Sequence, residues 1–291
     1  MIEYLKNYVI LELTKTYFLQ KNKKGYLMSN KAKIREEAKK LNPIDNLMFQ
    51  KMAEEVVFCE EILRVFLSDP NLTILDTTPQ YFGTNLQGRS VILDAKCILS
   101  SGKQINIEVQ KANDDNHQKR ARYNGAILTT NLTDPGTKFE QVPDVCVIFL
   151  SEFDLFKENH SLYHIDRVIR ETGKVVENGF EEIYINAKGN DGSEVSELMQ
   201  VFTNDTTYNN KFPITSDRKR RYKQTEEGQK EMSELIEKIR NEGKLEGKLE
   251  GKLETLYSLV KQGLLSLTEG AIQANMTEES FQKNMNKMFP V

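Results

Sequence analysis

The stretch RSVILDAKCILSSGKQINIEVQK (residues 89–111) contains two runs rich in Val, Ile and Leu, separated by a Ser-Gly turn at 101–102. Two such runs around a short turn that contains glycine predict a β-hairpin. In the second run apolar and polar residues alternate, so Asn106, Glu108 and Gln110 should share one face of the strand. This hairpin is the centre of the predicted fold.

Patterns typical of helices and strands flank the hairpin. Apolar residues at three- and four-residue spacings over 45–67 predict an amphipathic helix, broken once, and a second helix is expected over 113–132. Together with further strands, these elements predict an α/β domain with a mixed sheet flanked by helices. The further strands are expected over 72–77, which a polar turn follows, over 144–153, and near 162–170 and 180–187.

The composition is that of a globular protein, since 38% of residues are hydrophobic and 29% are charged. Cys59, Cys97 and Cys146 lie far apart in the sequence and show neither a zinc-type spacing nor the even number of a disulfide framework, so we expect a reducing cytoplasm. The opening stretch (1–28) is interrupted by too many charges for a membrane span or a signal segment, and no membrane partner is expected.

Two carboxylates are expected on adjacent strands of the hairpin. Asp94 lies in the first strand, and Glu108 and Gln110 lie in the second, in a D-x13-E-x-Q pattern. Converging carboxylates are suited to Mg²⁺ or Mn²⁺, and such a metal assists hydrolysis of a phosphodiester. On spacing alone, however, the pattern favours two solvated carboxylates on a sheet face.

The sequence around this pair resembles one known family, the recombination-promoting nucleases, also described as PD-(D/E)xK nuclease family transposases. The resemblance covers the chain from about residue 40 to its end, which makes a chance similarity a poor explanation. It is carried by INIEVQKA (105–112), NLQGRSVILD (85–94), KRARYN (119–124), PIDNLMF (43–49), YHIDRVI (163–169) and RYKQTEEG (221–228).

The resemblance implies a restriction-endonuclease-like core and a catalytic set of four residues. Asp94 and Glu108 would be the ligands of Mg²⁺, with Mn²⁺ as an alternative, and Asp45 would be the acid of the first helix. Gln110 would stand where the superfamily usually has lysine. The implied function is a divalent-metal-dependent DNA endonuclease of low sequence specificity that promotes recombination.

Gln110 is a departure from the superfamily pattern, because an amide orients water but supplies no positive charge. Lys111 is expected on the opposite face of the strand and so cannot replace the missing lysine. Arg120 or Arg122, from the next helix, could restore the charge. The alternative function is a catalytically weak or inactive DNA-binding protein that retains the nuclease fold.

Basic residues supply the candidate DNA contacts, although the net charge is −3. The resemblance places Lys119, Arg120, Arg122 and Tyr123 along the cleft, where they would contact phosphates. A second basic run over 218–221, with Lys223, is open to two interpretations: non-specific contact with the DNA backbone, or a solvated surface.

Other enzyme classes lack their motifs in this sequence. It contains no G-x-S-x-G elbow, no Walker-type loop and no dinucleotide fingerprint, and no His/Cys cluster indicates zinc. His117 is expected at the surface or behind the site rather than in catalysis, as are His160 and His164.

The chain is expected to have four parts: a peripheral extension (1–40), a nuclease-like domain (41–224), a helical repeat segment (225–264) and a short two-helix segment (265–291). In the repeat EGKLEGKLEGKLE (242–254), a leucine stripe runs beside a glycine column on one helix. This pattern is compatible with a homo-oligomer formed through the C-terminal helix and, equally, with a spacer. The last segment lacks a basic face, which favours core packing or an oligomer contact.

Overall fold

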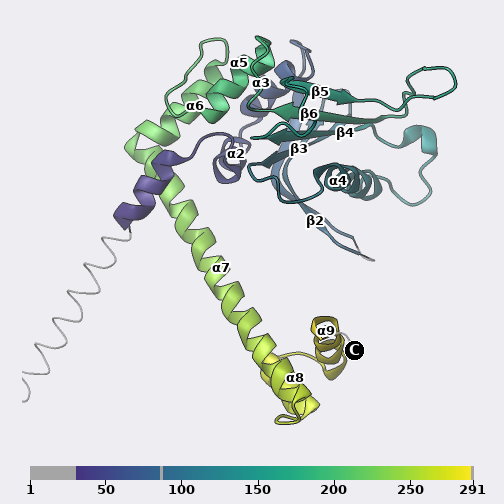
Figure 1. Cartoon of the computed structure of the whole chain (residues 1–291), viewed down its shortest axis with the longest axis vertical. Coiled ribbons are helices and arrows are strands. Elements are labelled where there is room, and N and C mark those ends of the chain that lie inside the picture. The colour runs from purple at the N-terminus through teal and green to yellow at the C-terminus, as the bar shows by residue number, and fades with distance from the viewer. Residues whose placement is uncertain (1–30, 86–87, 290–291) are drawn as a thin grey trace, which may run out of the picture. The chain divides into compact units, whose positions relative to one another are not determined.

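The computed structural model describes residues 31–85 and 88–289. Expectations for the opening stretch (1–28) therefore lie outside the described residues. The predicted mixed sheet is confirmed: its strand order is β1-β2-β3-β4-β6-β5 (Figure 1). The strands are β1 (Ile74–Gly83), β2 (Val91–Leu99), β3 (Gln104–Gln110), β4 (Val145–Ser151), β5 (Leu162–Ile165) and β6 (Phe180–Asn186). β1, β2 and β3 are antiparallel, β3, β4 and β6 are parallel, and β5 is antiparallel to β6.

Helices flank the sheet, as the sequence predicted. The expected helix over 45–67 is two helices with one break at 53–55, and α5 and α6 were not foreseen. Residues 31–40 are also helical. The remaining helices are α2 (Asn46–Met52), α3 (Val56–Phe66), α4 (His117–Asn131), η1 (Phe139–Gln141), α5 (Glu194–Thr203), α6 (Pro213–Gln224), α7 (Glu226–Lys261), α8 (Leu267–Ala274) and α9 (Glu278–Met288).

Strand β1 is longer than the sequence pattern indicated. The polar turn expected after residue 77 is wrong, because the strand continues through Pro79 to Gly83. β1 is a terminal strand of the sheet, where a proline without an N–H removes no needed hydrogen bond. The polar side chains of Asp76, Thr78 and Gln80 are exposed, so they cost little to place in the strand.

Helix α4 covers one face of the sheet and positions the functional residues. Ala121 and Leu128 pack against Val147 and Phe149 of β4 in one buried cluster. Gly125 lies so close to the Phe180 ring that a Cβ atom would clash with it. α4 therefore lies tightly against the sheet, with its first turns next to the end of β3.

The second basic run holds α6 in the fold. Lys219 is fully buried, and its Nζ donates hydrogen bonds to the carbonyl oxygens of Val201 (2.8 Å), Thr207 (3.1 Å) and Asn204. The run also forms ion pairs between Arg218 and Glu55, between Arg221 and Glu231 (2.6 Å), and between Lys223 and Asp205 (2.9 Å). These four side chains stabilise the fold, so a merely solvated surface does not describe them. Arg220 of the same run is exposed, and contact of the run with the DNA backbone stays a prediction.

The chain forms two compact units, which divide between Met232 and Ser233. In the second unit, Leu256, Tyr257, Ala271 and Phe281 form a small core, which confirms core packing for the last segment. Leu249 of the repeat is 59% exposed.

The division of the chain into four parts stays a prediction. Within the described part of the chain, no helix is both long and apolar enough to cross a membrane.

Candidate active site

Asp94 and Glu108 lie side by side on β2 and β3. Ala95 and Ile107 are direct partners in the antiparallel ladder. Asp94 comes just before Ala95 and Glu108 just after Ile107, so the two acids occupy neighbouring positions on adjacent strands. Asp94 is 4% exposed and Glu108 is 1% exposed. The interpretation as solvated sheet-face residues is therefore wrong, since a buried carboxylate is costly unless it is paired or binds a cation.

Glu108 is the more perturbed of the two acids. Burial and, to a smaller extent, the neighbouring Asp94 charge together raise the pKa of Glu108 to about 7, while Arg120 acts in the opposite direction. Its Oε2 accepts a hydrogen bond from Arg120 Nη2 at 2.9 Å. Its Oε1 is buried and has no hydrogen-bond partner. That oxygen is available to a cation held between the two acids.

Asp94 is held by hydrogen bonds to both of its oxygens. Oδ1 accepts from Gln50 Nε2 at 3.0 Å, and Oδ2 accepts from the Val109 backbone N–H at 2.9 Å. Burial raises the pKa of Asp94, and these hydrogen bonds partly offset that effect. The contact of Gln50, on α2, with Asp94 was not predicted from the sequence. Asn46, one helical turn earlier, also stabilises the Asp94 carboxylate.

The residues present fit a divalent cation. A buried pair of carboxylates with one free oxygen suits Mg²⁺, which is commonly held by one or two carboxylates together with waters and substrate phosphates. Over residues 31–85 and 88–289, no group of three or more His, Cys, Asp or Glu side chains is arranged to hold a metal. The candidate site is therefore a two-carboxylate site.

The structure does not bring Asp45 into this pair. Asp45 Oδ1 accepts a hydrogen bond from Lys111 Nζ at 2.8 Å, and Oδ2 accepts one from the Asn42 backbone N–H at 2.7 Å. Lys111 also lies 3.7 Å from Glu152. Lys111 is thus directed to two other acids, in keeping with its expected position away from the face that carries Glu108.

Gln110 lies next to a positive charge. Arg120 Nη1 donates to Gln110 Oε1 at 3.3 Å while Nη2 of the same guanidinium bonds Glu108. Gln110 Nε2 donates to the Ala112 carbonyl at 3.0 Å and to Asp114 Oδ1 at 3.3 Å. Of the two arginines considered from the sequence, Arg120 is the one that reaches Gln110.

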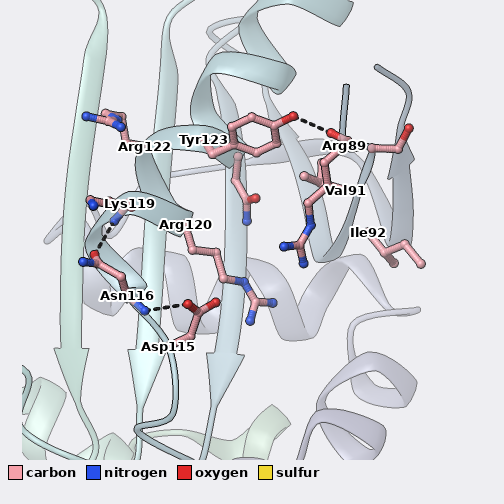
Figure 2. Close-up of a pocket in the computed structure, with 11 residues that line it drawn as sticks. Arg89, Val91, Ile92, Asp115, Asn116, Lys119, Arg120, Arg122 and Tyr123 are labelled. Carbon is pink, nitrogen blue, oxygen red and sulfur yellow. Dashed lines mark hydrogen bonds between the residues drawn. The ribbon is translucent and has the colours of Figure 1, made fainter. Parts of the chain in front are cut away.

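A basic pocket of about 630 Å³ lies between α4 and the start of β2 (Figure 2), and it is lined by Arg120, which bonds Glu108, but by neither carboxylate of the acid pair. Figure 2 shows Lys119 and Arg122 on one side, Arg89 on the other, and Arg120 between them. Tyr123 also lines the pocket, and its hydroxyl donates to the Arg89 carbonyl. Arg89 was not singled out from the sequence, although it belongs to the NLQGRSVILD motif.

His117 lies behind the site, and the alternative of a surface position is wrong. It is 1% exposed, and its ring lies 5.1 Å from the Phe149 ring and 5.2 Å from the Phe153 ring. Phe149 is the register partner of Glu108 in β4. Burial lowers the pKa of His117, which favours the neutral imidazole.

We expect the metal-free protein to lose stability as the pH rises from about 4.5 to 7, because of Glu108. Its folded-state pKa of about 7 lies above the ordinary 4.5, so the folded state binds the proton more tightly. The resulting stabilisation is fully present below pH 4.5 and is lost as the pH rises through 7. It is on the order of 3 kcal/mol.

Urea unfolding with chelator between pH 4.5 and 7.5 measures this effect as a difference between wild type and Glu108→Gln. Since Gln does not titrate, the variant should have the flatter profile. Parallel profiles for the two proteins would contradict the raised pKa.

Comparison with known families places these residues in context. The model of the PD-(D/E)XK nuclease family transposases matches residues 58–245, more than half of the chain. The matched range contains Asp94, Glu108, Gln110 and α4. No curated protein and no solved structure matches the chain.

Proposed function

The chain belongs to the PD-(D/E)XK nuclease family transposases, and on this basis we propose that it is a divalent-metal-dependent DNA endonuclease. The family supports a nuclease function and confirms the resemblance of the sequence motifs. The observation that carries the metal-dependent reaction is the buried pair of Asp94 and Glu108, in which Glu108 Oε1 has no partner.

Asp94 and Glu108 would hold Mg²⁺, or Mn²⁺ in its place. When bound, such an ion lowers the pKa of water and neutralises charge that develops on a phosphate. Arg120, which is ion-paired with Glu108 and lowers the pKa of Asp94 through its charge, would supply the positive charge that lysine gives elsewhere in the superfamily. Gln110 holds the Arg120 guanidinium in place through its carbonyl oxygen, whose second lone pair remains available to a water.

The basic pocket supports DNA as the partner. Lys119, Arg120 and Arg122, with Tyr123, would contact the sugar-phosphate backbone, and Arg89 joins them from the opposite wall. Backbone contacts fix the position of DNA but carry no direct sequence information, which supports low sequence specificity. Breaks made in this way would promote recombination. The location that we propose for the protein is the cytoplasm.

The test is incubation of the full chain with plasmid and Mg²⁺, with and without chelator. We expect nicking that disappears with chelator, and no nicking by a Glu108→Gln protein purified in the same way. DNA binding without nicking, over a range of Mg²⁺ and Mn²⁺ concentrations, would instead establish the weak or inactive DNA-binding protein.

Self-association through α7 is a separate part of the proposal. Leu245 is 69% exposed and Leu249 is 59% exposed, and a Cβ atom added at Gly243, Gly247 or Gly251 would meet no neighbouring atom within 4 Å. Two such faces could pack closely against one another.

We expect deletion of 242–291 to lower the solution mass to that of a smaller assembly and to leave cleavage unchanged. The deletion removes the exposed leucines but leaves the unit that contains Asp94 and Glu108. Sedimentation equilibrium measures the mass, with Leu245→Ser/Leu249→Ser as a matched variant that keeps the small C-terminal core. An unchanged number of chains per particle in both variants would favour the spacer.

A further inference from the structure

The acid pair receives a side chain from α2, and that side chain is Gln50. Its Nε2 donates to Asp94 Oδ1 at 3.0 Å, and its Oε1 accepts from Gln80 Nε2 at 2.7 Å. A glutamine amide has separate donor and acceptor ends. Gln80 therefore fixes which end of Gln50 faces the carboxylate.

The backbone of Gln80 has an unusual conformation. Its φ is 50°, in the left-handed region, although it lies within β1 and is not glycine. Its neighbours Pro79 and Tyr81 pair with Ala95 and Leu93, which flank Asp94 on β2. Residues held in this region carry strain, and such residues cluster at functional sites.

We propose that Gln50, oriented by Gln80, is a positioning residue that holds the Asp94 carboxylate for the divalent cation. This inference rests on the proposed function. Asp94 cannot rotate freely, because Gln50 binds one oxygen and the Val109 backbone N–H binds the other. Carboxylates that bind metals are commonly held in this way by hydrogen bonds from neighbouring groups.

Asp45, the other polar residue considered on this segment, has a different role. Its oxygens accept hydrogen bonds from Lys111 and from the Asn42 backbone. It anchors the start of α2, five residues before Gln50, and its effect on the metal is indirect.

The experiment measures Mn²⁺ affinity of the full chain by calorimetry, without DNA. Gln50→Met should weaken binding by about 10- to 100-fold, the range seen when groups that orient metal ligands are removed. Gln80→Met should weaken it less. The double variant should be no weaker than Gln50→Met alone, because Gln80 acts through Gln50. Gln141→Met, the same change at an exposed position, should bind as wild type does.

A Gln80→Asn variant separates the side chain from the backbone conformation. Asn is well suited to left-handed φ values but is one methylene shorter than Gln. It should therefore weaken Mn²⁺ binding as Gln80→Met does. Full affinity in Gln80→Asn would show that backbone shape alone matters, and would overturn the proposed relay.

The inference and the proposed function fail in different ways. A wild-type chain that binds no Mn²⁺ overturns the proposed function. Wild-type affinity in a folded Gln50→Met, or a larger loss in Asp45→Asn than in Gln50→Met, overturns the inference alone. If thermal unfolding shows that Gln50→Met is not folded, the Mn²⁺ affinity of Gln80→Met becomes the test, because Gln80 is exposed and its replacement should leave the fold intact. Unchanged affinity in Gln80→Met then overturns the inference.

Discussion

Glu108→Gln should reduce Mg²⁺-dependent cleavage by on the order of 1000-fold, corresponding to the several kcal/mol that a bound metal contributes to a transition state. The change replaces a metal-ligand oxygen with an amide of nearly the same shape. Asp94→Ala and Glu108→Ala, which remove a ligand side chain outright, should abolish cleavage while the fold is kept. Glu108→Gln is the sharper test, because it leaves the buried volume almost unchanged.

Stability distinguishes a catalytic role from a structural one. Burial of Glu108 raises its pKa, so at neutral pH the ionised side chain costs folding free energy. Glu108→Gln should therefore unfold at the same or a higher urea concentration than wild type at pH 7.5 with chelator. Glu140→Gln, on the exposed η1 segment, is the matched control with full cleavage. Retained cleavage in Glu108→Gln would refute the site.

Gln110→Lys, which restores the usual superfamily residue, should lower cleavage by at least about tenfold. The Arg120 guanidinium lies 3.3 Å from Gln110 Oε1, so a lysine ammonium would face a like charge there. Like charges about 4 Å apart repel by about 4 kcal/mol at the effective dielectric near a protein surface. We expect the lysine to displace Arg120 from Glu108, so that the arginine no longer supplies its positive charge at the acid pair.

Initial rates of plasmid nicking test this expectation, with Gln110→Met as the variant that removes the amide without adding charge. Arg120→Ala should itself be impaired, and Arg122→Ala less so, because only Arg120 bonds Glu108. A higher rate in Gln110→Lys, with Arg120→Ala and Arg122→Ala both fully active, would favour the weak-nuclease alternative.

The sequence by itself determined the hairpin, the mixed sheet and the acid pair. Each depends on local information: alternating residues define the faces of β3, and a short turn sets β2 beside it. The family resemblance, rather than this local pattern, offered Arg120 or Arg122 of the next helix as the replacement for lysine, and the structure shows that Arg120 bonds Glu108. α5 was missed despite its buried apolar residues, and β1 was drawn too short because an edge strand can expose polar side chains.

Only the tertiary structure decided how charged and polar side chains are used. Lys219 and Glu108 are both buried, but one donates to backbone carbonyls and the other has a free oxygen. Likewise Asp45, which caps the start of α2, pairs with Lys111, while Gln50 within α2 binds Asp94. Periodicity reports which face a residue occupies, whereas a charge is satisfied by partners that are distant in sequence, and those partners are set by packing.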